Sequence, residues 1–401
     1  MSLRPTDMIK SLELSGQDLS RPSSLAEEDE DKISLLPESL ICHILSFLTT
    51  DEAVFTSVLS STWRYLWKRV PKLELESSDF PNDEACVDFI DKFLNVQSLL
   101  EFSLCIDSDG SKNDASLYEF CLGKWIKRKI HYFEVLCHRN TKIPIKLPPC
   151  EALGCLSLND TSSCVLDTPR LEYLSLIDNN FKSLNIISMS DSVEVFIDVD
   201  FKLMHHDLSE RNIIHNLLSN FSAIGDMTIS WTTLKLIHGL RHTNPLPKFR
   251  YLTCLHATMS LDASPELLPI VLESCPNLKR LTLVVTCFKH FGNIMRWIRL
   301  RRLENFVMDD DPEGVATILS NVLPYCLVCS LEYVTIRSPI TDKATTRKLV
   351  RYFLGNATSL KNLVLRLSVF YGEKPHNFDR VKQYFDSPRR SHLCHFEVIW
   401  D

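Results

Sequence analysis

Cys326 and Cys329 have the Cys-x-x-Cys spacing of many metal sites and are the first residues in this sequence that could do chemistry. Such a pair supplies half of a structural zinc site, because tetrahedral zinc takes four protein ligands. No second Cys-x-x-Cys pair occurs in the chain. Both cysteines also directly precede an apolar segment of strand type. We therefore expect them to pack as small core residues rather than to bind zinc.

A run of polar residues, His205-His206-Asp207, is the second candidate for a metal site. Adjacent residues point in different directions on a helix or a strand, so they chelate a single ion poorly. We expect this run to lie in a solvated loop. The sequence thus predicts neither a metal nor a cofactor.

Two segments combine basic residues with a tryptophan, residues 124–129 and 296–302. An aromatic ring among cations can stack on single-stranded nucleic acid, or the cations can hold an anionic ligand. An amphipathic helix with its tryptophan turned inward explains the same pattern, and we favour it. The net charge of −7 disfavours a nucleic-acid partner. The ten glycines form no phosphate-binding loop sequence.

Serine, histidine and aspartate are all present, but the sequence places no nucleophile, base and acid together. We therefore expect a non-catalytic protein. Fourteen scattered cysteines, no signal-peptide core after Met1 and only short apolar runs favour reduced thiols and no membrane partner. The expected location is the cytoplasm or the nucleus.

The elements that must position such residues begin with a helical segment, residues 31–78. Apolar residues recur there three and four apart, which indicates a helix with one apolar face, at Leu36, Leu40, Ile44, Leu45 and Leu48. A capping box, Thr49-x-x-Glu52, opens a second helix. Trp63, Leu66 and Trp67 mark a third. A segment of this length cannot bury so much apolar surface alone, so we expect it to dock on another protein.

This segment resembles the F-box of plant F-box/leucine-rich-repeat proteins. The resemblance rests on Asp31-Lys32-Ile33-Ser34, Leu36-Pro37, Ile44-Leu45-Ser46-Phe47-Leu48, Ala53-Val54, Ser57-Val58-Leu59-Ser60 and Trp63-Arg64-Tyr65-Leu66-Trp67. It implies docking on a Skp-type adaptor, and through it on a cullin, by Leu36, Pro37, Leu40, Ile44, Leu45, Val58, Leu59, Trp63 and Trp67. The family usually has a basic pair directly before the tryptophan, where this chain has Ser61-Thr62.

From about residue 80 the chain repeats the pattern L-x-x-L-x-L, with other apolar residues allowed. Good copies are Leu153-Leu156-Leu158, Leu171-Leu174-Leu176, Ile224-Met227-Ile229, Leu278-Leu281-Leu283, Leu331-Val334-Ile336 and Leu360-Leu363-Leu365. Weaker copies begin at Leu99, Phe133, Val193, Phe249, Leu303 and Leu393. Their spacing of roughly 20–30 residues is that of leucine-rich repeats. Helical sequence separates several copies, which predicts an irregular α/β solenoid with a curved parallel sheet and helices on its convex side.

The C-terminal part resembles the FBD domain found in many of these plant proteins. The matching residues are 329–340, 349–354, 360–363 and 387–391, and residues 168–174 and 272–278 also resemble the family. We expect a disordered acidic tail at 1–30, an F-box at 31–79, leucine-rich repeats at 80–325 and an α/β FBD domain at 326–401.

The strand positions between the leucines should face the concave side of the solenoid. They are the candidate contacts to a protein target: Tyr173, Ser175, Arg280, Thr282, Tyr333, Thr335, Arg337, Asn362 and Arg366. Tyrosine and arginine are enriched among the residues that dominate binding energy at interfaces.

The resemblance implies that the chain is the substrate-recognition subunit of an SCF-type cullin-RING ubiquitin ligase, with an unknown protein substrate. Two alternatives remain open: a leucine-rich-repeat scaffold outside any ligase, and a small-molecule sensor with residues 296–302 in its pocket. The family usually has about two more repeats between the segments like residues 146–149 and 168–171. The recognition face is therefore expected to be smaller than in relatives.

Overall fold

Strands and helices of the computed structural model form two compact units, which we describe separately: residues 1–161 with 167–171, and residues 162–166 with 172–401. The structure describes residues 33, 35–94, 99–106, 130–137, 143–146, 150–159, 161–178, 183–199, 208–240, 246–260, 267–286, 323–338, 344–367 and 387–400. The tail 1–30, the run His205-His206-Asp207, the basic segments 124–129 and 296–302 and the repeat expected at Leu303 lie outside the described residues.

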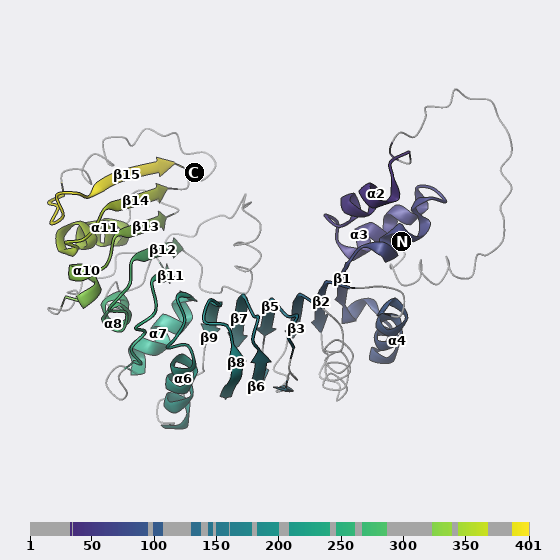
Figure 1. The fold of residues 1–401 in the computed structure, drawn as a ribbon, viewed down its shortest axis with the longest axis horizontal. Helices are drawn as coiled ribbons and strands as arrows, with labels where there is room; N and C mark the ends of the chain where they lie inside the picture. Colours follow the sequence, from purple (N-terminus) through teal and green to yellow (C-terminus); the bar gives the residue numbers. More distant parts are fainter. Residues whose placement is uncertain are drawn as a thin grey trace. The chain divides into compact units, whose positions relative to one another are not determined.

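The first unit contains the predicted helical segment (Figure 1). Its elements are α2 (Glu38–Leu45), α3 (Thr50–Phe55) and two 3-10 helices, Thr56–Val58 and Trp63–Arg69. The predicted capping box is confirmed, since the Glu52 N–H donates to Thr49 Oγ1 at 3.3 Å and the Thr49 N–H donates to Glu52 Oε2 at 3.0 Å. The third helix is of the 3-10 type, in which residues three apart lie on the same side. Trp63 and Leu66 are accordingly both buried.

Parallel strands follow in the first unit, together with α4 (Asp83–Leu94) and a 3-10 turn, Ser77–Asp79. Their order is β1 (Lys72–Glu76), β2 (Glu101–Ile106), β3 (Tyr132–Cys137) and β5 (Cys155–Asn159). Leu73, Phe102, Phe133 and Leu156 are aligned across these strands and are all buried. The rings of Phe102 and Phe133 stack with centroids 5.8 Å apart. This aligned row forms the core of the first sheet.

Parallel strands also form the body of the second unit, in the order β7 (Tyr173–Asp178), β9 (Glu194–Val199), β10 (Asp226–Ile229), β11 (Cys254–Ser260), β12 (Arg280–Thr286), β13 (Tyr333–Ser338), β14 (Asn362–Leu367) and β15 (His395–Trp400). The helices between them are α6 (Leu208–Asn220), α7 (Trp231–Leu240), α8 (Leu267–Glu273), α10 (Tyr325–Cys329) and α11 (Ala344–Asn356). Figure 1 shows these helices along one side of the strands. The predicted α/β fold with a parallel sheet is confirmed.

Three strands were not expected from the repeat pattern: β4 (Ile143–Lys146), β6 (Thr161–Thr168) and β8 (Ser183–Met189). In the second unit, β6 neighbours β8 in a smaller sheet. None of the helices in the described part of the chain is long and apolar enough to cross a membrane.

Strand register confirms the good copies of the repeat. One buried row runs across β10 to β15 through Met227, Leu255, Leu281, Val334, Leu363 and Phe396. The copies that begin at Ile224, Leu278, Leu331 and Leu360 predict this row. Side chains two residues apart share a face of a strand, so the same copies also bury their third apolar residue.

Three weaker copies are placed wrongly by the sequence pattern. The copy expected to begin at Val193 would put Phe196 in the buried row, whereas the ladder puts Val195 there. By the strand ladder, the copy expected to begin at Phe133 begins three residues earlier. The copy expected to begin at Phe249 begins three residues later. In these segments, apolar residues also lie beside the positions of the buried row and in the residues that precede the strand. Apolar spacing alone therefore does not fix the register there.

Candidate functional site

The helical segment exposes five of the apolar residues expected to contact an adaptor, here together called the docking surface: Pro37, Leu40, Ile44, Val58 and Leu59. The exposed fractions are 49% and 42% for Leu40 and Ile44, and 65% and 64% for Val58 and Leu59. The geometry of helix α2 explains why Leu40 and Ile44 are exposed. Ile41 points into the core, whereas Leu40 and Ile44 lie on the neighbouring face of the helix. Leu36 is half-buried.

Three residues expected to touch the adaptor are instead buried in the core of the segment: Leu45, Trp63 and Trp67. Leu45 lies one helical turn after Ile41, on the inner face of α2. The 3-10 helix carrying both tryptophans packs against α2. These three residues can support the docking surface from inside the domain, but they are not exposed on it.

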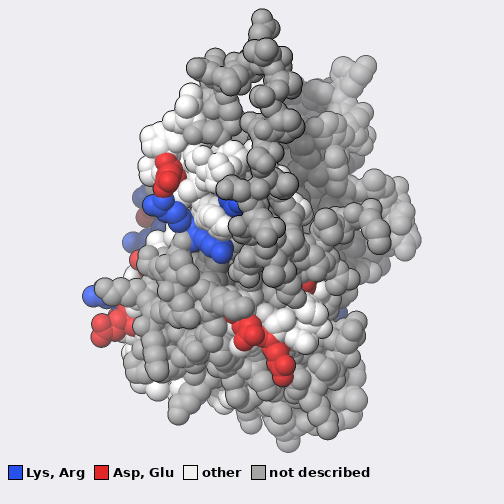
Figure 2. All heavy atoms as spheres, turned by 90° about the vertical axis from the view of Figure 1, so that its right-hand side faces the viewer, with Lys and Arg blue, Asp and Glu red and all other residues white. Residues whose placement is uncertain are grey.

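Further exposed apolar residues of this segment were missed: Ile33, Leu35, Phe47, Phe55 and Tyr65. Phe47 could have been found, since it continues the three-and-four spacing of Leu40 and Ile44. Its ring also meets that of His43, with centroids 5.0 Å apart. Figure 2 shows one face of the molecule, on which Lys and Arg (blue) and Asp and Glu (red) make up only a few of the described residues.

Ser61 and Thr62 are both exposed, at the place where the family usually carries a basic pair. Cations lie nearby in sequence: Lys68 stands over the rings of Tyr65 and Trp67 at 5.5 and 5.4 Å, and Arg69 pairs with Glu38. The basic residues of this part of the segment, Arg64, Lys68 and Arg69, thus follow Trp63 rather than precede it.

A second candidate surface is the face of the second sheet that carries the residues between the leucines, here called the recognition face. Ladder partners in a parallel sheet lie side by side on one face. Its first row runs through Tyr173, Glu194, Asp226, Cys254, Arg280, Tyr333, Asn362 and His395. Its second row runs through Ser175, Phe196, Thr228, His256, Thr282, Thr335, Val364 and Glu397.

The expected target contacts all fall on this face, but they differ in exposure. Arg280, Tyr333 and Arg337 are exposed. The half-buried ones are Tyr173, Thr282, Thr335, Asn362 and Arg366. Ser175 is fully buried, contrary to the expectation of an exposed contact. Its ladder partner on the same face is Phe196, which is also buried, so water does not reach this end of the second row.

Charge is divided across the recognition face. Acidic residues lie on β9 and β10, at Glu194, Asp198 and Asp226. Basic residues lie on β12 to β14, where Arg337 and Arg366 are ladder partners. Burial, with a further contribution from Asp226, raises the pKa of the Glu194 carboxyl. A ligand that spans β9 to β14 would meet acidic groups on β9 and β10 and basic groups on β12 to β14.

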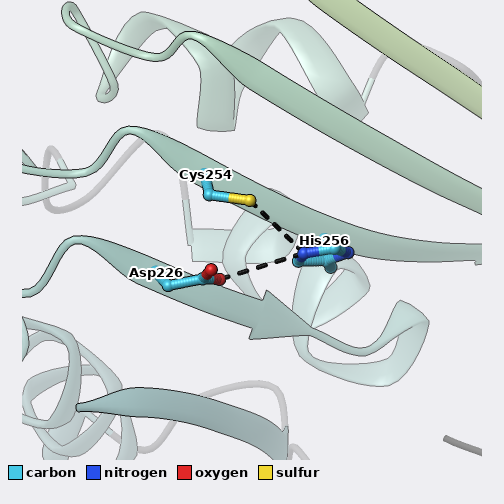
Figure 3. A group of neighbouring side chains, drawn as sticks. All are labelled: Asp226, Cys254 and His256. Atoms are coloured by element: carbon cyan, nitrogen blue, oxygen red, sulfur yellow. Dashed lines mark hydrogen bonds and ion pairs between the residues drawn. The ribbon is translucent and has the colours of Figure 1, made fainter. Parts of the chain in front are cut away.

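Asp226, Cys254 and His256 meet where the two charge regions join (Figure 3). Their ligand-type atoms lie within 4.8 Å of one another. His256 Nε2 is 3.3 Å from Cys254 Sγ and 3.9 Å from Asp226 Oδ1. Burial first, then the Asp226 charge, raises the pKa of the Cys254 thiol to about 12. Burial also lowers the pKa of His256, an effect that Asp226 opposes and Arg337 and Arg280 reinforce.

Sequence reasoning missed this cluster, because Asp226 lies 28 residues before Cys254 and no motif joins them. The ladder between β10 and β11 makes them direct neighbours. Of the expected Cys-x-x-Cys pair, Cys326 is buried and its thiol donates to the Leu272 carbonyl at 3.5 Å. Cys329 is exposed at the last residue of α10, so it does not pack in the core as expected.

The exposed apolar helices and the repeat-built parallel sheet together define a binding protein of the F-box/leucine-rich-repeat class. The F-box domain family matches residues 33–75, and the FBD family matches residues 320–365. An F-box/FBD/LRR-repeat protein of Arabidopsis thaliana is 43% identical, covering 98% of this chain and 96% of its own length. An FBD-associated F-box protein of the same plant is 36% identical, covering 92% and 98%. The chain belongs to the F-box/FBD/LRR-repeat family.

The first of these relatives is longer than this chain. Its alignment has 482 positions against 401 residues here, so at least 81 positions have no counterpart in the chain. That length corresponds to about three repeats of 20–29 residues. The expectation of a repeat array shorter than in relatives stays a prediction.

Proposed function

We propose that this protein is the substrate-recognition subunit of an SCF-type cullin-RING ubiquitin ligase. Its F-box docks on a Skp-type adaptor, and its repeats and FBD domain bind a target protein. The observation that carries the proposal is the apolar docking surface, where Leu40, Ile44, Val58 and Leu59 are each more than two-fifths exposed. Membership of the F-box/FBD/LRR-repeat family supports an adaptor role of this kind.

The docking surface has a physical reason to bind a partner. Clustered exposed apolar side chains are rare on soluble monomers and mark interaction sites. The inner residues Ile41 and Leu45 are fully buried, whereas Leu40 and Ile44 on the outer face of α2 keep 49% and 42% of their surface exposed. Their burial against an adaptor would contribute about 1.5–3 kcal/mol for each fully buried large side chain.

The proposed contribution of this chain to catalysis is proximity. The described residues contain no arrangement that we assign to bond-making chemistry, and the family suggests a non-catalytic subunit. A receptor that holds a target lysine near the ubiquitin thioester raises its effective concentration. The protein then works in the cytoplasm or the nucleus, where such ligases meet their substrates.

The adaptor contact is tested by co-purification of the full-length protein with a Skp-type adaptor and a cullin. We expect the Leu36→Ala, Pro37→Ala double variant to lose most of the adaptor. The matched control is Ile187→Ala, which removes an equally exposed apolar side chain (64%) from β8, outside the F-box. Undiminished adaptor binding by the double variant would refute the docking surface.

The target contact is tested on the recognition face. Reversing two exposed cations, Arg280→Glu and Arg337→Glu, should abolish capture of targets that accumulate when the proteasome is blocked. The control reverses two exposed cations on helices instead, Arg351→Glu on α11 and Lys235→Glu on α7. Equal target loss in both double variants would mean that the recognition face is not the binding surface.

A non-ligase scaffold is the second candidate, and the exposed Ser61-Thr62 pair favours it. This scaffold would retain target binding but would not co-purify a cullin from cell extracts. The small-molecule sensor has no support among the described residues, because its expected basic segment, 296–302, lies outside them.

A further inference from the structure

We propose that Asp226, Cys254 and His256 form a binding site for a zinc-class divalent cation on the recognition face. The three side chains bring an oxygen, a sulfur and a nitrogen donor together from the neighbouring strands β10 and β11 (Figure 3). This mixture of thiolate, imidazole and carboxylate is the donor set that zinc accepts in proteins. Residues 226–256 lie outside both family matches, which cover residues 33–75 and 320–365.

The distances between the donor atoms fit a tetrahedral ion. Ordinary zinc bond lengths place sulfur and nitrogen ligands about 3.6 Å apart and nitrogen and oxygen ligands about 3.4 Å apart. The observed separations are 3.3 Å for Cys254 Sγ to His256 Nε2 and 3.9 Å for His256 Nε2 to Asp226 Oδ1. Each separation is within about 0.5 Å of its tetrahedral value. The ligand atoms of Cys254 and Asp226 lie within 4.8 Å of each other.

The same geometry argues against a cysteine–histidine nucleophile. In a catalytic triad the histidine uses one ring nitrogen for the nucleophile and the other for the carboxylate. Here both Cys254 and Asp226 approach the same nitrogen, Nε2 of His256. Three donor atoms that converge on one point can bind one ion together. A proton relay would instead need the two nitrogens of the histidine to face the thiol and the carboxylate separately.

The charges and hydrogen bonds of the cluster also leave room for a cation. Asp226 Oδ1 is buried and accepts no hydrogen bond from the part of the chain that the structure describes. Glu194 is the ladder partner of Asp226 and adds a second carboxylate next to it. A divalent ion held by one thiolate and one carboxylate is neutral overall, so the nearby Arg280 and Arg337 oppose it only weakly.

Three protein ligands leave one position of a tetrahedral ion open. Asp226 and His256 are only half-buried, so the open position would face the recognition face and the solvent. A histidine, cysteine or carboxylate of a bound target could occupy it. The site would then link metal loading to target recognition, although metal binding itself does not depend on the proposed ligase role.

The test measures metal binding by the purified full-length protein under reducing conditions, after removal of metals with a chelator. Zn²⁺ is titrated and counted per chain, and Co²⁺ is used as a spectroscopic probe of thiolate coordination. We expect one Zn²⁺ per chain, a thiolate-to-cobalt absorption band and a higher melting temperature with Zn²⁺. Cys254→Ser should abolish the band and weaken Zn²⁺ binding by at least about tenfold, since even outer-shell partners are worth about 10- to 100-fold.

The control is Cys329→Ser, which removes an exposed thiol outside the cluster and should leave both signals intact. Asp226→Asn keeps the side-chain shape and should weaken binding, so it decides the question if Cys254→Ser does not fold. The proposal is overturned if the unmodified protein binds no stoichiometric Zn²⁺. It is also overturned if Cys254→Ser and Asp226→Asn bind as tightly as the unmodified protein, or if Cys329→Ser loses as much binding as Cys254→Ser.

Discussion

The docking surface makes a quantitative prediction about Val58 and Leu59, which follow one another just after α3. Changing both to alanine removes five carbon atoms, each worth about 0.8 kcal/mol when fully transferred from water to a partner. The two side chains are 65% and 64% exposed, so about two-thirds of that energy is still available for docking. The expected loss is about 2–3 kcal/mol, or about 30- to 140-fold in the dissociation constant of the adaptor complex.

Isothermal titration of the purified protein with a Skp-type adaptor measures this loss directly. The melting temperature of the double variant should stay close to that of the unmodified protein, because little apolar area is lost from the core. Ile187→Ala should leave adaptor affinity unchanged. A change of less than about twofold in the double variant would refute the reasoning, because side chains this exposed would then stay in water in the complex.

Leu45→Ala should lower the stability of the F-box by about 2–5 kcal/mol in thermal unfolding, since Leu45 is fully buried and a cavity would remain. Burial and the charges of Asp79, Glu76 and Glu52 raise the pKa of Asp51. Stability should therefore fall as the pH rises through that pKa, and Asp51→Asn should raise the melting temperature at pH 7 but not near pH 3. Ser61→Lys with Thr62→Arg should tighten adaptor binding by about 0.2–1 kcal/mol per charge at low salt, and less at high salt.

The repeat pattern predicted the parallel sheet because each strand buries alternate residues, and stacked copies align those residues in rows. The prediction failed where apolar residues stand side by side, as at Val195 and Phe196. Both are buried, so hydrophobicity does not show which one belongs to the row. Only the hydrogen-bonded ladder to β10 decides it in favour of Val195.

The cluster of Asp226, Cys254 and His256 could not be predicted from the sequence for a different reason. The sequence offered only Cys326 and Cys329 at the spacing of a known motif, and we expected that pair to pack in the core rather than to bind zinc. The structure instead brings Asp226 to Cys254 and His256 through the pairing of β10 with β11. In a parallel repeat fold, chemistry can be assembled from residues on adjacent strands, here Asp226 on β10 with Cys254 and His256 on β11. A search along the chain cannot find such a site until the register between the repeats is known.

The F-box residues show why the division between core and surface matters for experiments. The sequence implied nine adaptor contacts, but Leu45, Trp63 and Trp67 are buried while Leu40, Val58 and Leu59 are exposed. Substitution of a buried residue would abolish adaptor binding by unfolding the domain, whatever the true docking surface is. Only the exposed residues separate lost contact from lost fold. A substitution at Val58 or Leu59 is therefore the informative test of whether this chain joins a ligase.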